Sequence, residues 1–387
     1  MSDVVPSLRV GIDIRPLGGA SGRRGVGSYI RGLLSEMTSA DGASGGIELV
    51  LFGSGAEGGD GLPDEVDGVT RVRLRRPRRA ITFWDQAAWF PTLASRRLAV
   101  FHSPFYAIPW LRPRRCRVVQ TIHDVTPVKY PGTVSTRNER IFRMNFRLAR
   151  SADRIIVPSE ATRRDVVALL SIPDETCVVI PEGCDIAARD IEAADAALPA
   201  VRGRLGLSDR RYLLHTGGHD RVKNLGRLIE AFSIIAPRIP DLALVLTGEH
   251  GTGTAVLMQA VARCGLIDRV RLPGWIPRTD LHALYRGATS VVYPSISEGF
   301  GLPVVEAMTC GTPVVASYAG ALPEVAGDAC LLVDPGDARG IAAAVLRVLE
   351  EPERASEMAR RGRERAAGFS WRAAARRTLD LYREMAS

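Results

Sequence analysis

The stretch 294–308 combines glycines, a proline and two glutamates at a spacing that suits anion and sugar binding. Gly299 and Gly301 let the backbone turn tightly and approach a ligand. Pro303 suits the first turn of a helix, whose free amides and dipole attract anions. A carboxylate aimed at a phosphate would repel it, so Glu298 and Glu306 are better suited to accept hydrogen bonds from sugar hydroxyls. The alternative is a glycine turn followed by an ordinary helix glutamate.

A second candidate for phosphate contact is Lys223. It follows the Gly217-Gly218 loop and stands at the start of a predicted helix. This context favours phosphate binding over an unattached surface charge, because amides at a helix start and a nearby ammonium act together. No Asp-x-Asp pair accompanies these motifs, and the histidines other than His123 show no metal-ligand spacing. We therefore predict no metal and no cofactor.

A first series of strand and helix patterns begins with a short run of branched residues, Leu8–Ile14. A glycine-rich stretch, 18–27, follows it and leads into a helix with apolar periodicity over 29–37. Ser159 begins a further helix. The other strands are predicted at 47–52, 118–122, 154–157 and 177–180. Strand, glycine loop and helix in this order open a doubly wound α/β domain.

The pattern breaks at residues 181–185, and an alanine-rich, weakly patterned stretch follows up to Arg204. Alternation then resumes, with a helix at 225–235 and strands at 212–216, 242–246, 269–272, 290–293, 313–316 and 330–333. We predict one domain over 1–185 and a second over 186–368. Segment 369–387 is amphipathic, and we expect a helix that can pack back on the first domain.

Composition is that of an ordinary soluble protein, with 46% hydrophobic and 24% charged residues. No apolar run approaches the ~20 residues that cross a bilayer, and the N-terminus lacks the apolar core of a signal peptide. These features predict a cytoplasmic protein. The six cysteines form no CxxC pair, which favours reduced, structural thiols.

Arginine accounts for most of the net charge of +8. The run Arg71–Arg79 is the densest cluster, and Arg112, Arg114, Arg115 and Arg117 form the next. Such runs fit either a solvated surface or a peripheral contact with an anionic membrane on its cytoplasmic face. Nucleic acid is not expected as a partner, because no helix-turn-helix, zinc finger or RNP-like strand accompanies the charge.

In order along the chain, these motifs resemble the retaining glycosyltransferases of family 4, in the branch that handles mannose or rhamnose. That family carries two glutamates with seven residues between them, around Gly-Phe-Gly-Leu-Pro, as Glu298 and Glu306 do here. Further matches lie at 25–29, 101–104, 121–124 and 152–159, so the resemblance covers nearly the whole chain. It implies the GT-B fold, an α/β architecture of two Rossmann-like, doubly wound parallel-sheet domains facing a cleft.

The resemblance also implies roles for single residues of the second domain. Glu298 would contact hydroxyls of the transferred sugar, and Glu306 would bind the ribose. Lys223 would neutralise the diphosphate. The amides of the nest would hold sugar and phosphate, and they belong to Phe300, Gly301 and Leu302.

In the first domain, the resemblance assigns the first glycine loop to Gly25 and Gly27, and it makes His123 face the transferred sugar. A satisfied loop histidine is the alternative at His123. The chain also departs from the family, which often carries an arginine about five residues before the lysine. Gly218 occupies that place in the nucleotide-sugar site, and Arg221 is the candidate replacement for the missing charge.

The function that follows is metal-independent, retaining transfer of a hexose from a nucleotide-diphosphate sugar. GDP-mannose is the favoured donor, and the acceptor is a glycan, a lipid-linked sugar or a natural product. Lys223, Arg221 and the helix amides would stabilise the leaving diphosphate, whose own oxygen would serve as the base. Two alternatives stay open: a catalytically silent sugar-nucleotide-binding protein, and a GT-B sugar-nucleotide epimerase.

Overall fold

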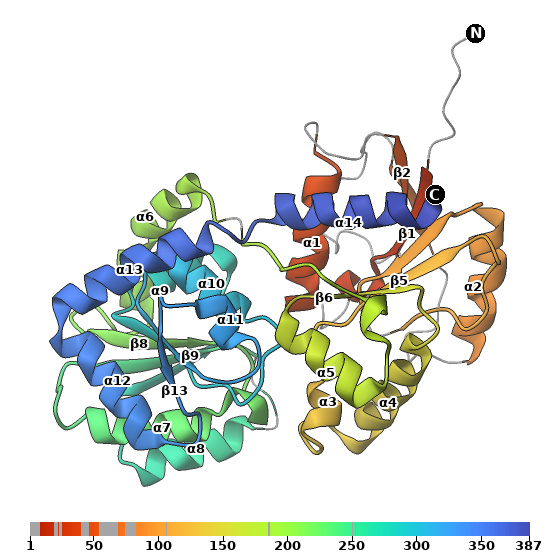
Figure 1. The fold of residues 1–387 in the computed structure, drawn as a ribbon. Helices are drawn as coiled ribbons and strands as arrows, with labels where there is room; N and C mark the ends of the chain where they lie inside the picture. Colours follow the sequence, from red (N-terminus) through yellow and green to blue (C-terminus); the bar gives the residue numbers. More distant parts are fainter. Residues whose placement is uncertain are drawn as a thin grey trace. The chain divides into compact units, whose positions relative to one another are not determined.

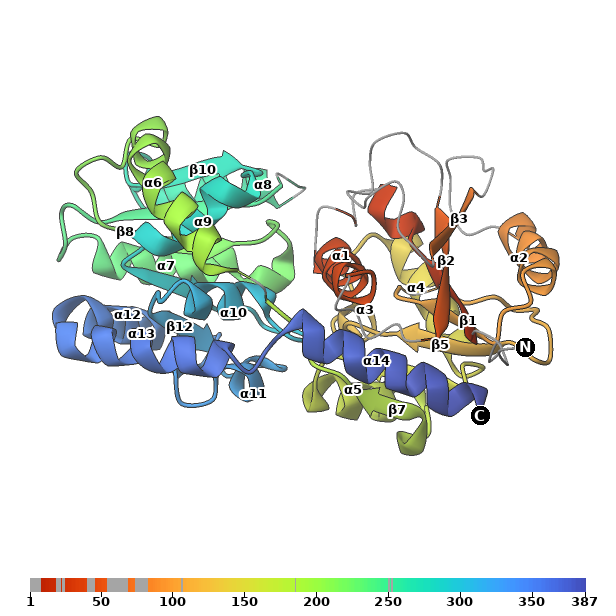
Figure 2. The ribbon, with the colours of Figure 1, turned by 90° about the horizontal axis from the view of Figure 1, so that it is seen from above.

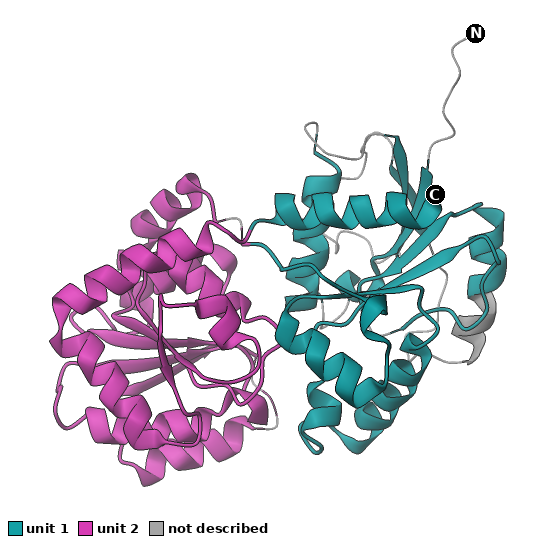
Figure 3. Cartoon of the chain, viewed as in Figure 1, with its two compact units in different colours: residues 1–183, 370–387 teal, residues 184–369 magenta. Residues whose placement is uncertain are grey.

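The computed structural model of the chain describes residues 8–18, 22, 25–39, 46–53, 69–73, 83–105, 107–184, 186–249, 251 and 253–387 (Figure 1). The chain divides into two compact units, coloured separately in Figure 3. Unit 1 comprises residues 1–183 and 370–387, and unit 2 comprises residues 184–369. Unit 1 is thus built from two separate parts of the chain, whereas unit 2 is continuous.

In its described residues, unit 1 contains one parallel sheet in the order β3-β2-β1-β4-β5-β6-β7. The strands are β1 (Leu8–Asp13), β2 (Ile47–Gly53), β3 (Val69–Arg73), β4 (Val100–Ser103), β5 (Arg117–Thr121), β6 (Arg154–Val157) and β7 (Cys177–Val179). The helices are η1 (Arg15–Gly18), α1 (Gly25–Met37), α2 (Phe83–Ser95), α3 (Thr126–Lys129), α4 (Thr136–Ala149), α5 (Glu160–Leu170), η3 (Asp174–Thr176) and α14 (Trp371–Ala386). Valine, isoleucine and leucine dominate the strands, as a sheet covered on both faces requires.

Helix α14 belongs to unit 1 although it comes last in the chain. Its Trp371 packs against Gly32 of α1 so closely that a Cβ on that glycine would come within 2.3 Å of the indole. Farther along, the buried Tyr382 hydroxyl lies 2.5 Å from His102 Nδ1. His102 Nε2 lies 2.8 Å from Thr121 Oγ1, and burial lowers the pKa of His102 to about 3. A neutral imidazole therefore ties α14 to β4 and β5.

Unit 2 repeats the architecture with a parallel sheet in the order β10-β9-β8-β11-β12-β13 in its described residues. The strands are β8 (Tyr212–Thr216), β9 (Ala243–Thr247), β10 (Val270–Gly274), β11 (Ser290–Tyr293), β12 (Val314–Ser317) and β13 (Leu331–Val333). The helices are α6 (Ala188–Arg204), η4 (Arg221–Lys223), α7 (Leu225–Ile235), α8 (Thr254–Arg263), α9 (Arg278–Gly287), α10 (Leu302–Thr309), α11 (Leu322–Ala326), α12 (Ala338–Glu350) and α13 (Pro352–Ala366).

Helices cover both faces of the unit 2 sheet (Figures 1 and 2). α6 packs with α9 on one face, and α7 packs with α12 on the other. The core between sheet, α7 and α12 includes Leu228, Phe232, Leu244, Val292 and Val345, all with 0% exposure. Two Rossmann-like parallel-sheet units confirm the predicted fold class.

Among the elements that the sequence expectations missed are two strands and one helix. β3 and β4 were not predicted, and residues 188–204, expected to be weakly patterned, form helix α6. α6 contains Pro199 and buries only Ala194 and Val201, so its apolar face is too sparse to produce a helical pattern. β3 is an edge strand paired only with β2, and its arginines mask the alternation. Of the basic run 71–79, residues 74–79 lie outside the described residues.

Candidate active site

The residues predicted to bind the donor in unit 2 gather where the strand order reverses. The sheet starts with β8 and grows first towards β9 and β10, whereas β11 lies on the other side of β8. Such a reversal of strand order is where open α/β sheets bind ligands, beyond the carboxyl ends of the strands. Lys223 follows β8, and Glu298 follows β11.

Two hydrogen bonds join these loops on either side of Lys223. The amide of Ile296 donates to the carbonyl of Val222 over 2.9 Å, and Asn224 Nδ2 donates to the carbonyl of Pro294 over 3.0 Å. Asn224 has a φ of 57°, in the left-handed region that asparagine tolerates better than most residues. The backbone therefore holds Lys223 close to β11. Sequence reasoning did not identify Asn224.

Lys223, Tyr293 and Glu298 form the polar centre of the site. Lys223 Nζ donates to Tyr293 Oη and to Glu298 Oε1, each over 2.7 Å, and it also lies 5.1 Å from the centre of the tyrosine ring. The Lys223 side chain is 20% exposed and that of Glu298 is 13% exposed. Burial works to lower the pKa of Lys223, but the charge of Glu298 and the bond with Tyr293 outweigh it and raise the pKa. The site therefore holds a charged ammonium at neutral pH.

Helix α10 begins beside this cluster with free backbone donors. The amides of Phe300, Gly301 and Leu302 donate to no other group in the part of the chain that the structure describes. Gly301 has a φ of 105°, which favours glycine. An anion at the start of α10 would meet these amides and the positive end of the helix dipole. The Phe300 ring is buried and packs edge-on against Phe369, with ring centres 5.4 Å apart.

Gly320 supports the backbone of Glu298 from the loop after β12. A Cβ at this position would lie 2.4 Å from the Glu298 carbonyl oxygen, and the φ of 56° is left-handed. The next residue, Ala321, donates its amide to the same carbonyl over 2.9 Å. Gly320 therefore helps to fix where Glu298 stands. The sequence analysis missed it, because nothing in the sequence shows that the loops after β11 and β12 meet.

Glu306 is held separately from the lysine cluster. Tyr285 Oη donates to Glu306 Oε2 over 2.9 Å and lies 2.8 Å from Thr216 Oγ1, so Thr216 donates to the tyrosine. Burial raises the pKa of Glu306, against the hydrogen bond from Tyr285 and the charge of Arg278. A carboxylate with one oxygen fixed in this way keeps its other oxygen for a ligand hydroxyl.

Gly218 stands where the family often carries an arginine, and Arg221 is the candidate replacement. The two residues have different surroundings. Arg221 belongs to η4 and is exposed, and its guanidinium forms no hydrogen bond or ion pair with any residue that the structure describes. Its guanidinium is therefore unoccupied, but it does not join the Lys223 cluster. Gly218 is half-buried, and a Cβ there would lie 3.1 Å from Asp220 Oδ2.

His123 of unit 1 follows β5 and uses both ring nitrogens within that unit. Nδ1 lies 2.9 Å from Glu182 Oε1, and Nε2 lies 3.0 Å from the carbonyl oxygen of Pro104. Burial works to lower the pKa of His123, but Glu182, with the Pro104 carbonyl, outweighs it and raises the pKa. Because both partners are acceptors, the imidazolium with two N–H donors fits them. Sequence reasoning missed Glu182, which lies 59 residues away.

The first glycine loop lies in unit 1 as well. Gly25 and Gly27 stand in the first turn of α1. A Cβ on Gly27 would lie 2.0 Å from the carbonyl oxygen of Gly22, whereas one on Gly25 would meet open space. The close backbone contact explains why Gly27 is a glycine. The structure thus brings Lys223 and Glu298 together in unit 2, and it keeps His123, Gly25 and Gly27 in unit 1.

No group of three or more His, Cys, Asp and Glu side chains among the described residues is arranged to hold a metal ion. No helix in those residues is both long and apolar enough to span a bilayer.

Two Rossmann-like parallel-sheet units, with a lysine and a glutamate at the switch point of the second, are the arrangement of the GT-B glycosyltransferases. Comparisons with known proteins agree. Residues 23–188 match the family described as Glycosyltransferase Family 4, and residues 200–365 match Glycosyl transferases group 1. The chain belongs to glycosyltransferase family 4, enzymes that transfer a sugar from a nucleotide sugar.

Curated relatives extend over most of the chain. The O-antigen chain mannosyltransferase B of Escherichia coli is 32% identical over 322 residues, which are 81% of this chain and 80% of the relative. A D-inositol 3-phosphate glycosyltransferase of Kineococcus radiotolerans is 31% identical over 318 residues, 75% of this chain and 72% of the relative. Similarity to a mannosyltransferase and to an inositol phosphate glycosyltransferase supports the class of reaction.

Solved structures share the fold over almost the full length. Sucrose-phosphate synthase from Thermosynechococcus elongatus has a TM-score of 0.75 at 25% identity, and the match covers 98% of this chain and 99% of that one. Anabaena HepE in complex with UDP and glucose has a TM-score of 0.72 at 20% identity, with 97% and 100% covered. At that identity, the second likeness shows the fold alone.

Proposed function

We propose that this chain is a metal-independent, retaining hexosyltransferase that uses a nucleotide-diphosphate sugar, with GDP-mannose as the donor. The observation that carries the proposal is the Lys223–Glu298 pair beside the unoccupied amides of Phe300, Gly301 and Leu302. A diphosphate at the start of α10 would take the amides and the ammonium, and Glu298 would then turn to hydroxyls of the sugar. The acceptor is a glycan, a lipid-linked sugar or a natural product.

The mannose donor is supported by relatedness. The Escherichia coli relative, 32% identical over most of both chains, is named as a mannosyltransferase. The test is a panel of nucleotide sugars in a thermal-shift assay, because a ligand that binds only the folded state must raise the melting temperature. GDP-mannose is expected to raise it more than UDP-glucose or dTDP-rhamnose. An equal or larger shift with UDP-glucose would overturn the choice of donor.

Metal independence is supported by the buried ammonium of Lys223. A fixed positive charge beside helix amides can stabilise the charge that grows on the departing diphosphate. Arg221 lies two residues before Lys223, and its guanidinium is unoccupied, so it is the candidate for a second positive charge. Transfer in excess EDTA is expected to continue at nearly the rate without chelator. Loss of turnover that magnesium or manganese restores would overturn this part of the proposal.

Retention is supported by the hydrogen bonds of His123, the unit 1 residue expected to face the transferred sugar. An inverting enzyme needs a group that takes the acceptor proton from the face opposite the leaving group. His123 donates from both ring nitrogens to Glu182 and Pro104, so the imidazolium offers no lone pair. The departing phosphate is then the base, on the same face as the bond that breaks. Proton NMR of the first-formed product should show the donor's anomeric configuration.

Donor hydrolysis separates this proposal from a silent sugar-nucleotide-binding protein. An active transferase should release free GDP from GDP-mannose slowly without acceptor and faster with it. An epimerase would instead convert the sugar and leave the nucleotide bond intact in the main product. Nucleotide release and sugar identity, measured together by ion-exchange chromatography, distinguish the three.

A further inference from the structure

The loop that connects β4 to β5 presents an apolar tip among arginines. Trp110 is 41% exposed and Leu111 is 65% exposed. Their neighbours are buried: Ile108 before them and Cys116 after them are 1% and 2% exposed, and each belongs to a different hydrophobic cluster of unit 1. The loop is thus anchored at both ends and displays two large apolar side chains between the anchors.

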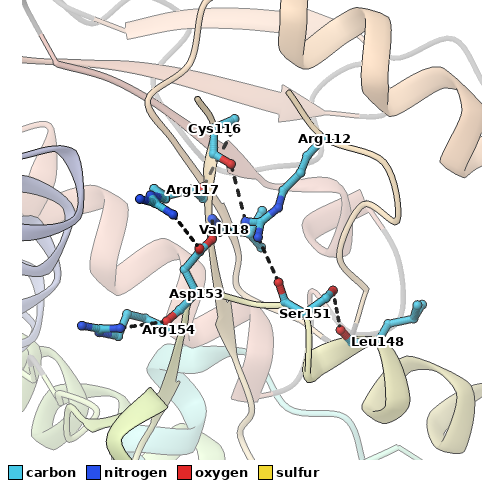
Figure 4. Close-up of polar contacts among 8 residues, drawn as sticks. All are labelled: Arg112, Cys116, Arg117, Val118, Leu148, Ser151, Asp153 and Arg154. Carbon is cyan, nitrogen blue, oxygen red and sulfur yellow. Dashed lines mark hydrogen bonds and ion pairs between the residues drawn. The ribbon is translucent and has the colours of Figure 1, made fainter. Parts of the chain in front are cut away.

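Asp153 fixes the shape of this loop (Figure 4). Its carboxylate pairs with Arg112, lies 3.3 Å from Arg117 Nη1, and accepts from the amide of Val118 over 2.7 Å. Arg112 also donates to the carbonyl of Ser151 over 3.1 Å. Burial works to raise the pKa of Asp153, but Arg112, Val118 and Arg117 outweigh it and lower the pKa. Asp153 therefore stays ionised at neutral pH and holds the loop.

The positive charge of this surface is only partly compensated. Arg114 and Arg115 are exposed and form no hydrogen bond or ion pair with any residue that the structure describes. Because β4, β5 and β6 are parallel neighbours, Arg154, the first residue of β6, lies at the same end of the sheet as the start of β5. Glu384 forms an ion pair with Arg154 there. Two carboxylates, Asp153 and Glu384, thus face five arginines there.

We infer that residues 110–117, called here the docking loop, bind the surface of an anionic bilayer. Tryptophan and leucine at an exposed tip suit the interfacial layer, where an indole has one apolar face and one polar edge. Arginines beside them are drawn to anionic headgroups. A protein partner would not need the unpaired arginines, and a soluble anion would not need the apolar tip. The combination fits a lipid surface with both properties.

Within unit 1, this surface lies at the opposite end of β5 from His123. The docking loop ends at Arg117, the first residue of β5, and His123 follows the last residue of that strand, so the length of β5, about 17 Å, lies between them. Substitutions in the loop are therefore expected to leave nucleotide binding intact. The inference does not depend on which sugar is transferred, and its test contains no donor.

The test is cosedimentation of the full chain with vesicles at low and high salt. One set of vesicles contains phosphatidylcholine alone, and the other contains about 30% phosphatidylglycerol as the anionic lipid. The wild-type chain should bind the anionic vesicles, bind the neutral ones weakly, and lose binding in high salt. Arg114→Glu with Arg115→Glu should lower the partition coefficient about tenfold or more. Trp110→Ser with Leu111→Ser should lower it by a similar factor and should leave the residual binding equally salt-sensitive.

Matched controls lie in unit 2. Arg263→Glu with Arg339→Glu changes the net charge equally, and Val256→Ser with Ile267→Ser removes two side chains that are 63% and 61% exposed. Both should bind vesicles as the wild type does, apart from the small uniform effect of charge. Equal loss of vesicle binding in the control variants and the loop variants would overturn the inference. So would loop variants that bind as well as the wild type, or a wild-type chain that does not bind. If the apolar pair fails to fold, as circular dichroism would show, the arginine pair still decides.

Discussion

At the scale of single residues, the choice of lysine at position 223 is informative. The chain has 51 basic residues, and only Lys129 and Lys223 among them are lysines. An ammonium is a compact charge that can donate to Tyr293 and Glu298 at once, whereas the planar guanidinium of arginine needs partners arranged in a fork. The flexible side chain of lysine can also keep its charge close to a diphosphate as it leaves.

Replacing Lys223 with alanine should lower kcat by about 100- to 1,000-fold, the usual effect of removing one preorganised charge stabiliser. The substitution also leaves the 13% exposed Glu298 without its cation, so a small loss of stability is expected. Lys223→Ala with Glu298→Gln should recover that stability without recovering activity. Lys129→Ala, which breaks an exposed pair with Asp165, is the matched control and should keep wild-type kcat. Near-wild-type turnover of Lys223→Ala would mean that the diphosphate binds elsewhere.

The His123–Glu182 pair predicts how stability depends on pH. The folded-state pKa of His123 is raised above its ordinary value of 6.5. Its contribution to stability is therefore complete below pH 6.5 and is lost as the pH rises through the folded pKa. The difference in melting temperature between the wild type and Glu182→Gln should shrink from pH 6 towards pH 9. A constant difference would show that the pair does not titrate as a unit.

At the scale of elements, the loops after β8, β11 and β12 form the site by supporting one another. Val222 bonds to Ile296, Asn224 bonds to Pro294, and Gly320 fits under Glu298. Each loop is short and begins at a strand whose position the sheet fixes. Contacts between neighbouring loops therefore help to position the functional side chains.

Replacing Gly320 with alanine should disturb this support. The new Cβ would sit 2.4 Å from the Glu298 carbonyl at a φ of 56°, and left-handed backbone alone costs about 1–2 kcal/mol for a residue other than glycine. We expect the melting temperature to fall by about 3–8 °C. We expect kcat to fall about tenfold or more, because Glu298 moves. Gly226→Ala, in helix α7 where a Cβ meets nothing within 4 Å, should lose neither. Unchanged kcat in Gly320→Ala would remove its role in positioning Glu298.

The same elements show what could be predicted from the sequence. Strands at 212–216 and 290–293 were predicted with the bounds that β8 and β11 have, because both are short, apolar and followed by glycine or proline. The pairing of Lys223 with Glu298 was not predictable, since it depends on β8 and β11 being neighbours although β9 and β10 lie between them in the chain.

Partners distant in sequence were missed for the same reason. Tyr293 and Tyr285 look like ordinary core tyrosines in an apolar strand and an amphipathic helix, and only the fold aims their hydroxyls at Lys223 and Glu306. Glu182 lies in the segment where the strand pattern ends, so no periodicity marks it. The glycines and glutamates of 298–306 were found because their spacing is local.

At the scale of the whole molecule, the two units differ in continuity. Unit 2 is one stretch, residues 184–369, with its own sheet and core. A fragment of these residues should unfold cooperatively and bind GDP. A fragment of residues 1–183 lacks α14, whose Trp371 and Tyr382 are 5% and 0% exposed, and it should melt well below the same fragment joined to 370–387 by a flexible linker. Circular dichroism melts of the three fragments test this, and equal melting with and without α14 would contradict it.

The divided chain of unit 1 also sets an order of events during synthesis. Residues 370–387 are made after every residue of unit 2, so unit 2 can finish folding while unit 1 still waits for its last helix. At about 5–20 residues per second, the ribosome needs roughly 10–40 s to make the intervening unit. Throughout that time, the surface of α1 and β4 that α14 covers is open to water and to chaperones. A chain that stops short of α14 keeps that surface open, so unit 1 can finish folding only after unit 2 has been made.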